Sequence, residues 1–96
     1  MRLTNKLVHD IKKILLHYGP ESQKEKTMEE LIELKNELFS DAYGSHSELS
    51  DIKQEVADVY VMLEQIKMIY RFTDTEIVEV MRSKVDRQLR RMENET

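Results

Sequence analysis

Residues that break helices are rare in this chain. Its 96 residues contain two glycines and one proline, while 35% of the residues are charged. Glycine and proline interrupt helices most strongly, and the alternation of apolar and polar residues that favours strands is scarce. The sequence therefore predicts an all-α protein. Its length and uniform composition predict a single domain that spans residues 1–96.

Four helical segments are expected, with short connections between them. They run from about Leu3 to Tyr18, Pro20 to Phe39, Glu48 to Arg71 and Thr73 to Met92. Gly19 is suited to end the first segment, and Pro20 to begin the second. Ser47 is expected to cap the third, and Thr73 with Glu76 matches a capping box for the fourth. Short connections favour antiparallel neighbours, so we expect a compact, antiparallel four-helix arrangement.

Composition narrows the classes of function. The net charge of −4 gives no basic field for duplex nucleic acid, and the absence of cysteine excludes disulfides and thiolate metal sites. The longest apolar run, "VYVML", is too short for a membrane span, and the first ten residues lack the apolar core of a signal peptide. We therefore expect a soluble, cytoplasmic protein that binds neither membranes nor duplex nucleic acid.

Two carboxylates interrupt the apolar side of the third expected helix. At 100° per residue, that side is formed by Ile52, Val56, Val59, Leu63 and Ile66. Glu55 projects into this apolar stripe, and Asp58 lies at its edge. A second strip, formed by Ala57, Val61 and Met68 on the opposite side, is a candidate subunit interface. Burial of the two carboxylates is costly without a compensating partner, which suggests a specific role.

The second expected helix has a similar acidic pair. Glu30 and Glu33 are three residues apart and flank an apolar line formed by Thr27, Leu31, Leu34 and Leu38. If the two helices pack antiparallel, the four carboxylates converge, and a hard divalent cation such as Mg²⁺ would offset their repulsion. The alternative is that both pairs are ordinary solvated acids, which are common on helices rich in glutamate.

The motif "EELIE", followed after 21 residues by "EVAD", resembles the EExxE and ExxD signature of the MazG-like all-α nucleotide pyrophosphohydrolases. The resemblance implies hydrolysis of a nucleoside triphosphate to its monophosphate and pyrophosphate, with Mg²⁺ or Mn²⁺ as cofactor. It also implies a homodimer or homotetramer. By position, Glu30, Glu33, Glu55 and Asp58 become the expected catalytic metal ligands. Glu29 becomes an accessory acid.

Three basic residues lie together on the fourth expected helix. Lys84, Arg87 and Arg91 fall within a sector of about 60° beside the apolar face of this helix. We expect Lys84 and Arg87 to bind the triphosphate, with Arg91 as a weaker candidate. The alternative is that these residues only complement the dipole at the C-terminal end of the helix.

Two other classes of function remain open. One is a non-catalytic helical interaction or regulatory module with the same fold, which would not depend on a divalent cation. The other is a ferritin-like metal carrier. Carriers of that type use a histidine three residues after a glutamate, and none of the three histidines has this spacing.

Overall fold

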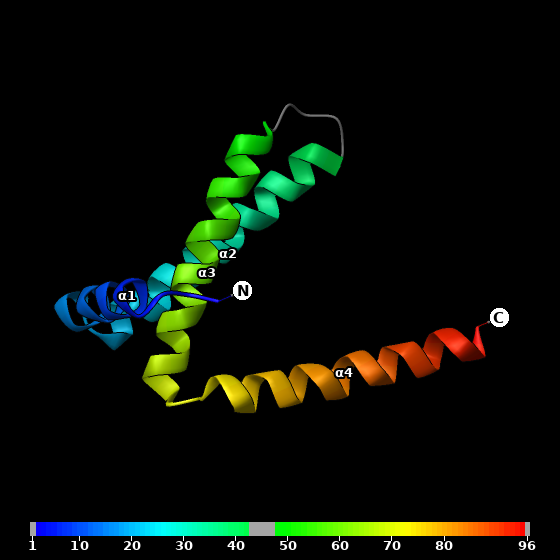
Figure 1. The fold of residues 1–96 in the computed structure, drawn as a ribbon. Helices are drawn as coiled ribbons and strands as arrows, with labels where there is room; N and C mark the ends of the chain where they lie inside the picture. Colours follow the sequence, from blue (N-terminus) through cyan, green and yellow to red (C-terminus); the bar gives the residue numbers. More distant parts are fainter. Residues whose placement is uncertain (1, 43–47, 96) are drawn as a thin grey trace.

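The computed structural model describes residues 2–42 and 48–95, and most of them belong to four α-helices (Figure 1). The helices are α1 (Asn5–Tyr18), α2 (Pro20–Ala42), α3 (Leu49–Tyr70) and α4 (Asp74–Asn94). No strand occurs among the described residues, which confirms the predicted all-α class. Over the same residues, no helix has both the length and the apolar character needed to cross a bilayer.

The helix boundaries follow local capping chemistry. Thr4 is the N-cap of α1, because its hydroxyl accepts a hydrogen bond from the backbone N–H of Leu7 at 3.1 Å. Gly19 ends α1 at a φ of 89°, where a side chain would be strained, and its N–H donates to the Leu15 carbonyl at 2.8 Å. The second helix begins at Pro20 as expected, but it ends at Ala42 rather than at Phe39.

The N-cap of α3 is Glu48. The expected cap, Ser47, lies outside the described residues.

The corner between α3 and α4 is fixed by local contacts. Thr73 and Glu76 form the predicted capping box, with reciprocal hydrogen bonds of 3.1 Å between each side chain and the other residue's backbone N–H. Arg71 has a φ of 60° and ends α3 in the left-handed conformation. Across the corner, the Lys67 ammonium donates to Glu64 at 2.9 Å and also pairs with Asp74. The direction in which α4 leaves the corner is therefore set close to the turn.

The packed part of the molecule contains three helices. α1, α2 and α3 pack against one another, whereas α4 packs against none of them beyond the Lys67–Asp74 ion pair at the corner, and it extends away (Figure 1). The expected compact arrangement of four helices is therefore not formed within one chain. The radius of gyration is 16.3 Å, compared with about 12.5 Å for a compact domain of 96 residues.

The buried side of α3 is rotated from the predicted apolar stripe. Val59 is buried as expected, but Val56 and Leu63 are exposed, and the neighbouring Met62 and Gln65 are buried instead. The second predicted strip is not a free surface throughout, because Val61 and Met68 are half-buried within the chain. On α2, Thr27 is buried, but the predicted inward residues Leu31 and Leu38 are about half exposed. Much of the apolar pattern on these helices thus has no partner in a single chain.

Candidate metal centre

Three of the four predicted ligands meet between α2 and α3. One carboxylate oxygen from each of Glu30, Glu55 and Asp58 lies within 4.8 Å of the others. Glu30 belongs to α2, and the other two lie one turn apart on α3, which runs beside α2 (Figure 1). Glu33 is exposed and is not a member of this group. We call these three residues the carboxylate cluster.

Burial within the carboxylate cluster is uneven. Glu30 is only 5% exposed, Glu55 is half-buried and Asp58 is exposed. The Oε2 atoms of Glu30 and Glu55 are buried, and neither has a hydrogen-bond partner among the described residues. Buried carboxylate oxygens without partners are costly, and in native proteins such atoms call for an explanation such as a bound ion or water.

Lys26 partly neutralises the cluster. Its ammonium is 3.0 Å from Glu30 Oε1 and 3.9 Å from Glu29 Oε2. Burial disfavours the charged form of Glu30, but hydrogen bonding with Lys26, together with the neighbouring Glu55, outweighs burial and lowers the pKa of Glu30 below its ordinary value. Glu30 therefore stays ionised at neutral pH. The one ammonium leaves Glu30 Oε2 without a partner among the described residues.

The three carboxylates are not independent. Burial, followed by the neighbouring Glu30 carboxyl and the charges of Glu33 and Asp58, raises the pKa of Glu55 to about 7. The cluster without a cation therefore resists carrying its full negative charge.

A hard divalent cation fits this set of donors. Mg²⁺ and Mn²⁺ prefer carboxylate oxygens, and Mg²⁺ is usually held by few protein ligands because it keeps several waters. The buried, unpartnered oxygens of Glu30 and Glu55 would provide two ligands, and the exposed Asp58 would provide a third at the open side. Glu29 and Glu33 are exposed on α2 next to Glu30 and remain accessible to solvent.

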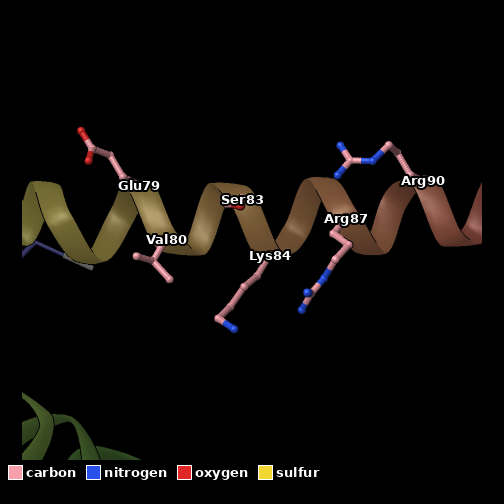
Figure 2. A pocket seen from close by; sticks show the side chains of 6 residues that line it. All are labelled: Glu79, Val80, Ser83, Lys84, Arg87 and Arg90. Carbon is pink, nitrogen blue, oxygen red and sulfur yellow. The ribbon is translucent and has the colours of Figure 1, made fainter.

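The two predicted phosphate-binding residues lie elsewhere. Lys84 and Arg87 project from the same side of α4 and line a shallow hollow (Figure 2). Every residue that lines this hollow belongs to α4: Glu79, Val80, Ser83, Lys84, Arg87 and Arg90. Since α4 meets the other described helices only at its first residue, where Asp74 pairs with Lys67, Lys84 and Arg87 are separated from the carboxylate cluster of their own chain.

Two polar residues near the carboxylate cluster were not singled out from the sequence. Lys26 has a readable signal, because it precedes Glu30 by four residues, the spacing of ion pairs on a helix. Gln65 is 1% exposed, and nothing in its spacing distinguishes it from a solvated glutamine.

Comparison with known proteins adds no family assignment. No family model matches the sequence, and no curated protein or solved structure shows significant similarity to it. Function therefore has to be inferred from the residues, their geometry and the acidic motif.

Proposed function

We propose that this protein is a Mg²⁺-dependent nucleoside triphosphate pyrophosphohydrolase of the MazG-like type. The observation that carries the proposal is the meeting of Glu30, Glu55 and Asp58 within 4.8 Å, with two buried carboxylate oxygens that lack partners among the described residues. The same three residues belong to the EExxE and ExxD motifs. A structural ion pair would be expected to satisfy these oxygens, whereas a cation site needs them unpaired.

The residues in and around the carboxylate cluster would have different roles. Glu30, Glu55 and Asp58 would hold the cation, and Lys26 orients Glu30 by binding its Oε1 atom at 3.0 Å. A bound Mg²⁺ would supply charge neutralisation to phosphate oxygens. Glu33, the fourth predicted ligand, and Glu29 are exposed beside the cluster, where they are open to water or to a second cation.

We also propose that α2 and α3 pack antiparallel to each other. Lys24, in the first turns of α2, lies 5.7 Å from the ring centroid of Tyr70 at the end of α3. Glu30 lies further along α2 and meets Glu55 and Asp58 nearer the beginning of α3. These pairs support antiparallel packing of the two helices.

The complete protein is, in this proposal, a homodimer or a larger homo-oligomer. The solvent-accessible surface of one chain is 8024 Å², whereas a compact monomer of 11.5 kDa exposes about 5,800 Å². The excess of about 2,200 Å² exceeds the roughly 800 Å² that one partner buries in a standard interface. No residue of α4 is buried, so this helix contributes to the excess.

The surface of α4 suits a second copy of the chain. Its apolar side, which we call the α4 stripe, is formed by Ile77, Val78, Met81, Val85, Leu89 and Met92. From residue 81 to 92 the helix carries five basic residues and one acidic residue, whereas α2 carries seven acidic and three basic residues. The stripe would cover the exposed Leu31 and Leu38 of a second copy, and would bring Lys84 and Arg87 towards its carboxylate cluster.

The alternative function is a non-catalytic helical interaction module. The exposed α4 stripe favours it, because an unpartnered apolar helix face is typical of a protein interaction surface. The two functions differ in one requirement, since the interaction module has no need for a divalent cation.

The test is an assay of pyrophosphate release from a panel of ribo- and deoxyribonucleoside triphosphates with Mg²⁺. Wild type and Glu55→Gln are compared, with Glu21→Gln as a control for an exposed acid on α2 outside the cluster. The enzyme predicts release of pyrophosphate and monophosphate by wild type and Glu21→Gln, and its loss in Glu55→Gln. No release from any triphosphate, together with no cation binding, would favour the interaction module.

A further inference from the structure

A cavity of about 450 Å³ opens between the three packed helices. Its volume lies within the range of small-molecule sites. α1 contributes Ile14 and Tyr18, α2 contributes Gln23 and Lys26, and α3 contributes Met62 and Gln65. The cavity is therefore lined by all three helices of the α1 to α3 unit, whereas the hollow on α4 is lined by that helix alone.

Gln65 is the unusual residue of this cavity. It is 1% exposed, and its Oε1 and Nε2 atoms are both buried without a hydrogen-bond partner among the residues that the structure describes. A buried carboxamide that makes no hydrogen bond costs stability, whereas methionine or leucine would fill the same space without that cost. The donor and acceptor of Gln65 are thus unpaired at the cavity wall, where a ligand reaches them only if a side chain that covers them moves.

The other walls suit a flat ligand. Ile14, Val61 and Met62 offer apolar surface, and the largely exposed Tyr18 contributes an aromatic ring at the edge. Aromatic and apolar side chains of this kind bind the faces of planar rings, while a polar group such as Gln65 reads the ring edge.

The cavity adjoins the carboxylate cluster. Lys26 lines the cavity, and its ammonium lies 3.0 Å from Glu30 Oε1. On α3, Gln65 follows the cluster residue Asp58 by two helical turns, which is about 10 Å along the axis. A nucleotide spans a distance of this order between its base and its outer phosphates.

We propose that this cavity binds the nucleobase of the triphosphate and that the Gln65 carboxamide hydrogen-bonds to the base edge. Every nucleobase presents adjacent hydrogen-bond donors and acceptors on its edge, and glutamine pairs with adenine through two hydrogen bonds in this manner. Lys26 then lies between the base site and the cluster that holds the phosphates. This assignment rests on the proposed pyrophosphohydrolase function for its substrate, although the cavity and the unpaired carboxamide do not depend on it.

The test compares wild type with Gln65→Met, which conserves volume and removes the hydrogen-bonding groups. Gln54→Met, an exposed glutamine on the same helix, is the matched control. For each protein, kcat/KM is measured for the best nucleoside triphosphate and for ribose 5-triphosphate, which lacks a base. Gln65→Met should lower the ratio of the two values by about ten- to a hundredfold, and Gln54→Met should leave it unchanged. Thermal unfolding of each variant verifies that it is folded.

Two results would overturn the assignment while leaving the proposed function intact. One is an unchanged ratio in Gln65→Met, and the other is an equal fall for both substrates, which would make Gln65 a structural residue only. If wild type hydrolyses no triphosphate, the proposed function fails, and binding of nucleoside monophosphates without metal decides the base site. Binding that Gln65→Met weakens at least tenfold would uphold the base site, and absence of binding to wild type would refute it.

Discussion

The α1 to α3 unit and α4 have comparable helical patterns but opposite environments. In the unit, apolar residues such as Ile11 and Met62 are buried, and acidic residues are drawn together in a carboxylate cluster. In α4, the apolar stripe has no buried residue, and Lys84 and Arg87 are exposed beside it. Amphipathic periodicity specifies that a helix needs a partner, but it does not specify whether that partner is in the same chain.

The difference has a chemical side as well. The unit contains a carboxylate cluster that Lys26 neutralises only in part, whereas residues 81–92 of α4 include five basic residues and one acidic residue. A phosphate-rich substrate with a divalent cation would connect the two regions.

Removing a ligand of the carboxylate cluster should abolish pyrophosphate release without unfolding the protein. Asp58→Asn keeps the size of an exposed side chain and removes its charge. Because a bound cation contributes several kcal/mol to transition-state stabilisation, kcat for pyrophosphate release should fall roughly a thousandfold. Circular dichroism should show the helix content of wild type. An active Asp58→Asn variant would remove this residue from the ligand set.

A charge in the α4 stripe should break self-association. Val85→Glu places a carboxylate in the proposed interface, while Ser83→Glu places one on the side of the same helix opposite the stripe. We expect Val85→Glu to weaken the association about thirtyfold or more, the effect of a single interface hot spot of 2 kcal/mol. Sedimentation equilibrium measures it. The α4 stripe would not be the interface if the two variants associated equally well, or if wild type were monomeric.

Mixing two inactive variants should restore activity if α4 completes the site of another copy. Glu55→Gln lacks a working cluster, and Arg87→Ala lacks a phosphate-binding residue. In a randomly mixed dimer, about a quarter of the sites would contain both intact groups, so activity should approach a quarter of the wild-type value. If Arg87 instead acts on the cluster of its own chain, mixing gives no gain over the separate variants.

In the protein without a cation, the pH dependence of stability should reveal the raised pKa of Glu55. The folded state raises the pKa of Glu55 from 4.5 to about 7, so the folded state binds more protons than the unfolded state between these values. The contribution of Glu55 to stability is therefore fully present below pH 4.5 and is lost as the pH rises to about 7. Glu30, with a lowered pKa, loses its contribution only as the pH falls below its ordinary value of 4.5.

Melting temperatures at pH 5.5 and 8 with a chelator measure this effect. The fall in stability with rising pH should be smaller in Glu55→Gln, which retains the other titratable groups of the chain as an internal control. Saturating Mg²⁺ should reduce this fall in the stability of wild type, because a carboxylate must be ionised to bind the cation. The same pH dependence in both proteins would mean that Glu55 titrates normally.

The two regions also differ in how well the sequence predicts them. Local signals were reliable: the capping box of Thr73 and Glu76, the end of α1 at Gly19 and the start of α2 at Pro20 each depend on a few adjacent residues. The i, i+3 spacing of Glu55 and Asp58 also predicted that the two would share one surface. That surface meets Glu30, as the paired acidic motifs suggested.

Properties set by packing between helices were less predictable. α3 is apolar on more than one side, so periodicity could not decide that Met62 and Gln65, rather than Leu63, face inward. Glu33 has the same spacing signal as Glu30, yet it is exposed, since only the relative rotation of α2 and α3 distinguishes them. The separation of α4 depends on the α3 to α4 corner, which the apolar pattern within α4 does not predict.

The most direct test is binding of Mn²⁺, followed by its paramagnetic resonance signal, to wild type, Glu55→Gln and the control Glu21→Gln. The carboxylate cluster predicts binding to wild type and Glu21→Gln, competition by Mg²⁺, and at least tenfold weaker binding to Glu55→Gln. Equal binding to all three proteins, or none to wild type, would contradict a cation site at Glu30, Glu55 and Asp58.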